Sequence, residues 1–115
     1  MDKSFREITG HISAGTAKLR QAAPDAMAGF YALSKGAMKA GVLSELDKEL
    51  IAFAIGVASR CDGCIGFHAR ALVRLGATRE QVMETLAVAV YMGGGPALMH
   101  AADAVHAFEE FSARP

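Results

Sequence analysis

Two cysteines and a histidine form the pattern in this chain with the clearest capacity for chemistry. Cys61 and Cys64, the only cysteines among 115 residues, flank Asp62 and Gly63, and His68 follows four residues after the second cysteine. Such a Cys-x-x-Cys pair can close a small disulfide, hold part of a metal site, or cycle between dithiol and disulfide. The surroundings of the thiols decide among these chemistries, because a thiol acts as nucleophile or ligand only as a thiolate.

The pair lies at the start of a helix predicted from about Asp62 to Leu75, which Gly76 should end. Cys64 and His68 are four residues apart, so they share one helical face, which we expect to line an apolar, partly closed site. In the first turn of a helix, unpaired N–H groups and the helix dipole favour a thiolate. His68 can accept the proton of Cys64. The sequence therefore favours dithiol–disulfide cycling.

A carboxylate, Glu49, lies twelve residues before Cys61, which is about 18 Å along a continuous helix. Glu49 can approach the cysteines only if the chain turns back near Arg60 and two helices pack antiparallel. Such pairing leaves about 10 Å between Glu49 and His68. We therefore predict a carboxylate linked to His68 through water rather than by direct contact. Gly56, on the same face as Glu49, has no side chain to block the approach.

The periodicity of the whole chain is helical, and it predicts an all-α bundle of about five to seven helices in a single domain, residues 1–115. Caps, breaks and apolar stripes predict the further helices. They cover about residues 24–40, 45–58 (capped by Ser44), 79–91 (capped by Thr78), and 97–111 after the glycine break at 93–95. Residues 1–22 are predicted as short helices or loop, with a loop at 11–15. The core that carries the motif spans residues 43–110.

Composition restricts the partners and the compartment. Hydrophobic residues make up 52% of the chain and charged residues 21%, with a mean hydropathy of +0.24. This apolar surplus in a small domain predicts that other subunits cover part of its surface. The net charge is zero and the pI about 6.9, so no nucleic-acid partner is expected. A charged N-terminal stretch and the lack of a long apolar run predict a cytoplasmic protein without a membrane partner.

The combination of Glu49 with Cys61-x-x-Cys64-x-x-x-His68, followed by the run from Tyr91 to Pro96, resembles a known group of proteins. It is similar to the carboxymuconolactone decarboxylase superfamily, in its alkylhydroperoxidase-D-like branch, over roughly residues 43–105. The resemblance implies an all-helical fold assembled as trimers, or as hexamers built from two trimers. It also implies a peroxide-reducing or thiol–disulfide activity that needs no cofactor or metal.

The resemblance also implies a role for each residue of the motif. Cys64 would be the peroxidatic thiol, Cys61 the resolving thiol, His68 the proton acceptor, and Glu49 the far end of the proton relay. The expected partners are a small hydroperoxide and an external dithiol or thioredoxin-like reductant. A sulfenic acid on the peroxidatic thiol would condense with the resolving thiol, and the reductant would reopen the disulfide.

The chain departs from the family pattern in two respects. Gly63 stands before the second cysteine, where relatives often carry a bulky or ring-bearing residue. The chain also lacks the duplicated N-terminal half of longer relatives, so any site element from that half must come from residues 1–43 or from a neighbouring subunit. Lactone decarboxylases of the superfamily generally lack the cysteine pair. Its presence here argues against decarboxylation, although another substrate stays open.

Other interpretations of the motif remain open. The cysteines could be small buried hydrophobes, or they could form a redox-sensing module without catalysis. Cys61, Cys64 and His68 could also hold a zinc ion, but a closed site needs a fourth ligand, and only a folded-back His100 or His106 could supply it. By itself, Glu49 would be interpreted as an ordinary charge on a helix surface.

Tyr91 and His100 flank the glycine break and are second-tier candidates for the pocket. For both, packing in the core is the favoured interpretation. His11 and His106 are predicted to lie on the surface. The three glycines are predicted to break the helix and to permit close backbone packing.

Overall fold

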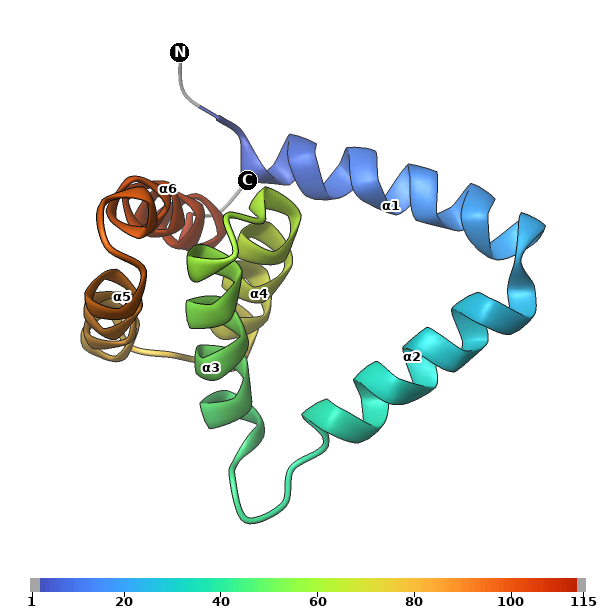
Figure 1. Ribbon diagram of the computed structural model, residues 1–115, viewed down its shortest axis with the longest axis horizontal. Helices are drawn as coiled ribbons and strands as arrows, with labels where there is room; N and C mark the ends of the chain where they lie inside the picture. Colours follow the sequence, from blue (N-terminus) through green and yellow to red (C-terminus); the bar gives the residue numbers. More distant parts are fainter. Residues whose placement is uncertain (1–2, 114–115) are drawn as a thin grey trace.

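The computed structural model describes residues 3–113 and contains six α-helices and no strand within that range (Figure 1). This confirms the predicted all-α fold. The helices are α1 (Phe5–Ala22), α2 (Pro24–Met38), α3 (Glu45–Ala58), α4 (Asp62–Arg74), α5 (Arg79–Gly93) and α6 (Gly95–Ser112).

Helices α3 to α6 pack together as a bundle around the hydrophobic core (Figure 1). Large apolar side chains of α3, α4 and α5 are fully or almost fully buried there, and α6 contributes small residues that let its backbone approach the other helices. These residues are Phe53, Val57, Ile65, Leu72, Val82, Leu86, Ala97, Ala101, Ala104 and Ala107. The apolar stripes predicted from the sequence therefore face one another in the core.

The predicted helix ends carry the expected caps. Ser44 Oγ accepts a hydrogen bond from Asp47 N at 3.0 Å at the start of α3. Thr78 and Gln81 form a reciprocal capping box at the start of α5. Gly76, with a φ of 79°, follows the end of α4 in the left-handed conformation predicted for it.

Helix α1 corrects the prediction for the N-terminal segment, because residues 5–22 form one continuous helix instead of short helices around a loop at 11–15. Residues 1–2 of that segment lie outside the described residues. Phe5 and Thr9 are buried where α1 packs across α4 and α6. At Gly15, the last residue of the predicted loop, an added Cβ would meet no other atom within 4 Å, and the same holds at Gly10. Packing at one end of α1 thus stabilises a helix whose own sequence is a weak helix former.

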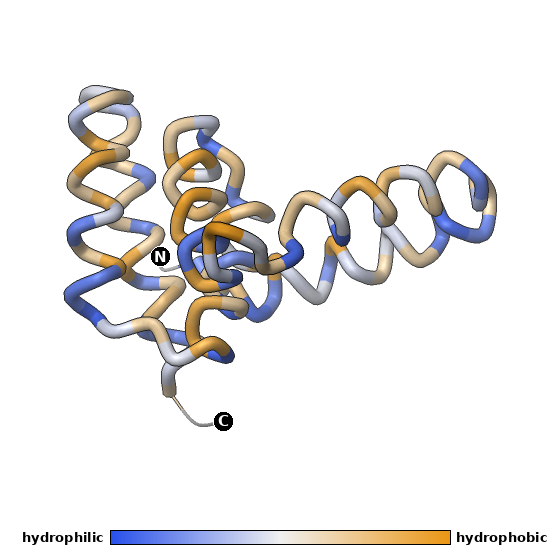
Figure 2. The backbone as a smooth tube through the Cα atoms, turned by 90° about the horizontal axis from the view of Figure 1, so that it is seen from below, coloured by the Kyte–Doolittle hydropathy of each residue, from blue (hydrophilic) through white to orange (hydrophobic). Residues whose placement is uncertain are grey.

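Helices α1 and α2 form a V-shaped arm that projects from the bundle (Figure 1). Every side chain of α2, from Pro24 to Met38, keeps part of its surface exposed, including Phe30 at 60% and Leu33 at 67%. Figure 2 shows hydrophobic residues recurring along the projecting part of the chain. The end of α2 is tied to α3 by Lys48 Nζ, which donates to Ala37 O at 3.0 Å and to Lys39 O at 2.6 Å.

Helix α3 leaves part of its apolar surface exposed. Ile51 and Ile55 are exposed, so within this chain α3 is not buried all round. Other large apolar side chains are exposed on α5 and α6, namely Val88, Tyr91, Met92, Leu98 and Met99. Within residues 3–113, none of the helices combines the length and the apolar character that crossing a bilayer requires.

Candidate functional site

A tight turn between α3 and α4 positions the first cysteine. Arg60 adopts a left-handed conformation with a φ of 58°. Its N–H donates to Val57 O at 3.1 Å, and Cys61 N donates to Gly56 O at 3.0 Å, which together form a Schellman motif at the end of α3. Cys61 is also the N-cap of α4, where its Sγ accepts a hydrogen bond from Cys64 N at 3.2 Å. The predicted position of Cys61, directly before the helix, is confirmed.

Cys61 and Cys64 are joined in a disulfide, with their Cα atoms 5.3 Å apart. Both residues are half-buried at the start of α4. The first N–H groups of α4 have no partner within the helix, and one of them, Cys64 N–H, donates to Cys61 Sγ. This position at a helix N-terminus favours a thiolate when the disulfide is opened. The two sulfur atoms can therefore exist as a bonded pair, and the location suits a reactive thiol in the reduced state.

His68 and Glu49 are in direct contact, which corrects the prediction of a water link. His68 Nδ1 lies 3.1 Å from Glu49 Oε1 and 3.0 Å from Oε2. Arg74 of α4 pairs with Glu45, one helical turn before Glu49, with its Nη2 3.4 Å from Oε1. Helices α3 and α4 approach closely because Gly56 lacks a side chain, since a Cβ there would lie 3.0 Å from Cys64 Cβ.

The contact with Glu49 sets the state of the imidazole ring. Glu49 is only 6% exposed, whereas the His68 side chain keeps 29% of its surface accessible. A carboxylate accepts hydrogen bonds, so Nδ1 is assigned as the protonated nitrogen and Nε2 as the acceptor. Within residues 3–113, Nε2 has no hydrogen-bond partner. His68 can therefore take a proton from a group in front of it while Glu49 stabilises the imidazolium.

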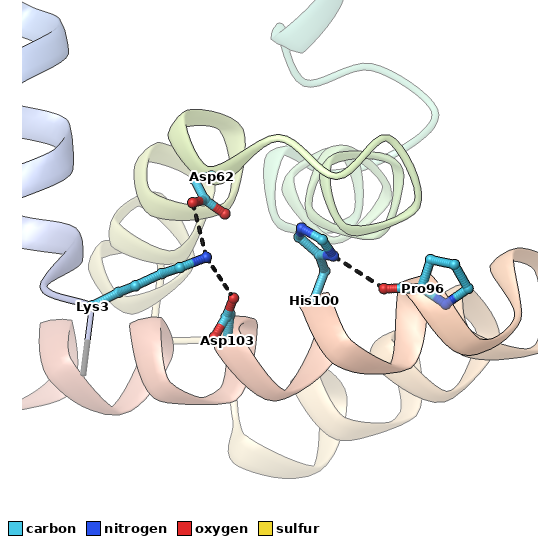
Figure 3. Close-up of polar contacts among 5 residues, drawn as sticks. All are labelled: Lys3, Asp62, Pro96, His100 and Asp103. Atoms are coloured by element: carbon cyan, nitrogen blue, oxygen red, sulfur yellow. Dashed lines mark hydrogen bonds and ion pairs between the residues drawn. The ribbon is translucent and has the colours of Figure 1, made fainter. Parts of the chain in front are cut away.

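A lysine near the N-terminus, Lys3, neutralises the charge of Asp62, which lies between the two cysteines in the sequence. Lys3 Nζ donates to Asp62 Oδ2 at 3.0 Å and to Asp103 Oδ2 at 2.9 Å (Figure 3). The hydrogen bonds to Asp103 and Asp62 raise the pKa of Lys3 above its usual 10.5. The charge of Asp62 would otherwise oppose a thiolate nearby. The role of Lys3 was not predicted, because no local pattern in the sequence connects residues that are 59 positions apart.

The cysteines open into a groove of about 650 Å³ between α4 and the arm. Residues of α1 and α2 form the walls that face Cys61, Cys64 and His68. The full lining is Ile12, Ser13, Thr16, Arg20, Phe30, Tyr31, Ser34, Cys61, Gly63, Cys64, Phe67 and His68. Residues 1–43 therefore supply site elements, one of the two sources anticipated from the length of the chain.

The groove also explains why glycine stands before the second cysteine. A Cβ on Gly63 would lie 2.6 Å from Ile12 Cδ1, so a larger residue there would displace α1 side chains from the site. In α4 the next glycine, Gly66, similarly faces Thr9 and Phe5 of α1. The two glycines let α1 lie directly against the start of α4.

The second-tier candidates lie elsewhere. Over residues 3–113, the lining of the groove includes neither Tyr91 nor His100. Tyr91 is 84% exposed, so its predicted packing in the core is wrong. His100 is half-buried, and its Nδ1 lies 3.0 Å from Pro96 O (Figure 3). His11 and His106 are exposed, as predicted.

The glycine break packs as predicted. Gly94 has a φ of 72° between α5 and α6, and a Cβ on Gly93 would lie 2.5 Å from Ala97 Cβ. In the part of the chain that the structure describes, no three His, Cys, Asp or Glu side chains gather as metal ligands. The charged and polar groups around the disulfide are thus the imidazole of His68 with the carboxylate of Glu49, and the carboxylate of Asp62 with the ammonium group of Lys3.

Comparison with known proteins extends the resemblance to most of the chain. The model of the carboxymuconolactone decarboxylase family matches residues 24–107. An uncharacterized protein of Cupriavidus necator is 44% identical over 95 residues, which cover 83% of this chain and 84% of the relative. The alkyl hydroperoxide reductase AhpD of Mycobacteroides abscessus is 41% identical over 46 residues, 40% of this chain and 26% of the relative.

Two solved structures share the fold. A carboxymuconolactone decarboxylase family protein from Legionella pneumophila has a TM-score of 0.94 and 55% identity, covering 95% of this chain and 97% of its own. A family member from Thermotoga maritima, for which an involvement in the antioxidative response has been suggested, has a TM-score of 0.77 and 29% identity. That match covers 94% of this chain and 89% of the relative.

Proposed function

Since this chain belongs to the carboxymuconolactone decarboxylase family, we propose that it is an antioxidant enzyme, a thiol-dependent peroxidase of the alkyl hydroperoxide reductase type. One observation carries this proposal. The Cys61–Cys64 disulfide lies in an open groove that His68 also lines, and Nδ1 of His68 is hydrogen-bonded to the buried carboxylate of Glu49. The match to an alkyl hydroperoxide reductase and the antioxidative response suggested for the Thermotoga maritima protein support the same chemistry.

The cycle begins with both cysteines reduced. His68 Nε2 accepts the proton of Cys64, and the Cys64 thiolate attacks the terminal oxygen of a hydroperoxide. An S–O bond forms, the O–O bond breaks, and the leaving alkoxide takes a proton from His68 to become an alcohol. Cys64 is then a sulfenic acid, oxidised by two electrons.

Resolution uses the second cysteine. Cys61 gives its proton to His68 and attacks the sulfur of the Cys64 sulfenic acid. The S–S bond forms, the S–O bond breaks, and the hydroxyl group takes the proton from His68 and leaves as water. An external dithiol or thioredoxin-like protein then attacks the disulfide and returns both thiols, becoming a disulfide itself. In the proposed cycle, the Cys61–Cys64 disulfide is the oxidised form of the enzyme.

The proposal includes a homo-oligomer, a trimer or a hexamer of two trimers, in the cytoplasm. The exposed apolar side chains of α3, α5 and α6 support association, because isolated monomers rarely leave such residues gathered at the surface. Ile51, Ile55, Tyr91 and Met92 would then lie under neighbouring subunits.

A thiol count tests the enzyme directly. The reduced protein is mixed with one equivalent of an organic hydroperoxide, and free thiols, peroxide and bound zinc are measured over time. Loss of two thiols together with one peroxide, without metal release, is the expected result. Stoichiometric zinc on the isolated protein would overturn the proposal in favour of a Cys₂His metal module. Slow loss of thiols without peroxide turnover would favour redox sensing or another substrate.

Two matched variants assign the sulfur atoms. Cys64→Ser should abolish peroxide consumption, whereas Cys61→Ser should still form a sulfenic acid that a dimedone probe traps on Cys64. Mass spectrometry of the labelled peptide distinguishes the two sites. A trapped sulfenic acid on Cys61 in the Cys64→Ser protein, with no reaction in Cys61→Ser, would reverse the roles.

A further inference from the structure

We propose that the groove between α4 and the arm binds hydroperoxides that carry a carboxylate at the far end of an apolar chain, and that Arg20 binds this carboxylate. The inference rests on the proposed peroxidase function and adds the class of substrate. It follows from the position of one cation in the groove, from the apolar walls, and from the distance between that cation and the cysteines.

The reactive end of the groove lies where α1 touches the start of α4. The side chain of Ile12 contacts Gly63, which lies between the two cysteines in the sequence. Ile12 is therefore the residue of α1 that lies beside the start of α4 and the cysteines. Phe67 and His68 line the same groove one turn further along α4. A hydroperoxide group placed here has Cys64 and His68 within the same cavity.

The charged end lies further along α1. Ile12, Thr16 and Arg20 are spaced by four residues and share one face of the helix. Arg20 is eight residues beyond Ile12, which is about 12 Å along the helix axis. Its guanidinium group lies 5.7 Å from the centre of the ring of Tyr31, which belongs to α2. Arg20 thus stands at a distance from the cysteines that a medium-length alkyl chain spans.

The charge of Arg20 is uncompensated by protein. Among residues 3–113, no Asp or Glu oxygen lies within ion-pair distance of its guanidinium, whereas Arg74 and Arg79 both have such partners. The described lining of the groove contains no acidic side chain. An arginine in this setting is suited to a carboxylate, which it can bind through two parallel hydrogen bonds. The groove therefore favours an anion at this end.

The walls between the two ends suit an apolar chain. Ile12, Phe30, Tyr31 and Phe67 provide apolar surface, and Phe30 is 60% exposed. The volume of about 650 Å³ lies within the range of about 300–1,000 Å³ that is usual for small-molecule sites. Burial of a ligand chain against these side chains would add to the ionic contact at Arg20.

A matched pair of substrates tests the inference. The substrates are a medium-chain ω-hydroperoxy fatty acid and its methyl ester, each reduced in a single turnover by the native protein, Arg20→Gln and Arg20→Lys. Lys18→Gln, which removes a positive charge on α1 outside this groove, is the control. Reopening of the disulfide by the neutral reductant dithiothreitol is measured separately, so that an effect on the reductant is distinguished from one on the peroxide.

We expect the native protein to reduce the acid about tenfold more efficiently than the ester, which corresponds to one charge-assisted hydrogen-bond pair. Arg20→Gln should remove this preference, and Lys18→Gln should leave it unchanged. Arg20→Lys should keep only part of it, because an ammonium group cannot bind a carboxylate through two parallel hydrogen bonds. The small neutral tert-butyl hydroperoxide should react equally with all four proteins. An unchanged preference in Arg20→Gln would overturn the inference.

The inference and the proposed function can fail separately. Calorimetric binding of decanoate, which has no peroxide group, tests the carboxylate site in a protein that turns out to reduce no peroxide. Weaker binding of decanoate to Arg20→Gln is expected. If Arg20→Gln instead changes the oligomeric state in sedimentation and leaves decanoate binding unaltered, a second copy of the chain occupies the groove and the inference is wrong.

Discussion

The bundle and the arm of this protein are held together by different means. In the bundle, α3 to α6 bury large apolar residues such as Phe53 and Ile65 completely. In the arm, no residue of α2 is buried. The end of α2 is connected to the bundle by the hydrogen bonds that Lys48 donates to two backbone carbonyls. The groups of the proposed chemistry all come from the bundle or its turns, whereas the arm supplies walls. The proposed catalytic groups therefore lie in the well-packed bundle, whereas access to them is controlled by the arm, which is packed least tightly.

The largest expected effect is on the stability of the bundle. Phe53→Ala removes a fully buried ring and should lower the free energy of unfolding by about 3–5 kcal/mol, because a cavity replaces its contacts. Urea unfolding followed by circular dichroism measures this change. A loss under 1 kcal/mol would show that the bundle is not the stable part of the molecule.

Next is the chemistry of the bundle. His68→Ala should slow peroxide reduction by about 10²-fold, because a positioned general base is lost. Glu49→Gln preserves the shape of the buried side chain and should have a smaller effect, since it removes only the charge behind His68. The pH dependence of thiol alkylation, measured for both variants beside the native protein, distinguishes a proton relay from a structural contact. An unaltered profile in His68→Ala would remove His68 from the relay.

Substitution of two glycines where α1 packs on α4 should destabilise this contact to different extents. A Cβ at Gly66 would lie 2.7 Å from Thr9 Cγ2 and 3.4 Å from Phe5, so Gly66→Ala should destabilise the docking of α1 by about 1–3 kcal/mol. Gly63→Ala meets only the flexible end of Ile12 and should cost less. Hydrogen exchange of α1 amides compares the two variants. Equal protection in both would contradict tight packing of α1 at Gly66.

A pH effect is expected at the same junction. Burial acts to raise the pKa of Glu110, but hydrogen bonds from Phe5 N, Ser4 Oγ and Arg6 N outweigh it and lower this pKa below the usual 4.5. The stabilisation is therefore complete above pH 4.5 and is lost as the pH falls through the lower pKa of the folded state.

Glu110→Gln should cost about 1 kcal/mol at neutral pH, comparable to the loss of a helix cap. It should also weaken the dependence of stability on pH in the acid range. Thermal unfolding at neutral and acidic pH checks both effects. A variant that keeps the full acid sensitivity of the native protein would show that other carboxylates cause it.

The smallest effect is expected in the arm. Leu33 is 67% exposed, so Leu33→Ala should change the free energy of unfolding by about 0.5 kcal/mol or less. Urea unfolding at two protein concentrations measures this loss and compares it with the loss in Phe53→Ala. A larger, concentration-dependent loss would mean that a second subunit covers α2, and the arm would then be constrained by assembly.

The same contrast explains what could be predicted from the sequence. Helix α2 was predicted although nothing buries it, because Pro24 and its neighbours favour a helix locally. Helix α1 was predicted as short helices around a loop at 11–15, since its local helical signal is weak and its support comes from α4 and α6. Local signals suffice for helices α2 to α6, their caps and the turn at Gly76, but they give no information about partners distant in sequence.

The candidate site divides in the same way. The spacing of Cys61, Cys64 and His68 placed them correctly around the start of one helix. The direct contact of Glu49 with His68 depends on how closely α3 and α4 approach, which the absence of a side chain at Gly56 controls. The walls formed by α1 and α2 required an arm whose direction no pattern in the sequence specifies.

The turn at Arg60 bears on the speed of the proposed cycle. The backbone of Cys61 is engaged in both directions, with its N–H bonded to Gly56 O at 3.0 Å and its C=O accepting from Ile65 N at 2.9 Å. Opening or closing the disulfide can then proceed by rotation of side chains, which takes picoseconds to nanoseconds when they are accessible, without remodelling the loop. The reorganisation energy between oxidised and reduced forms should be small, so a conformational step should not limit the turnover rate of the proposed cycle.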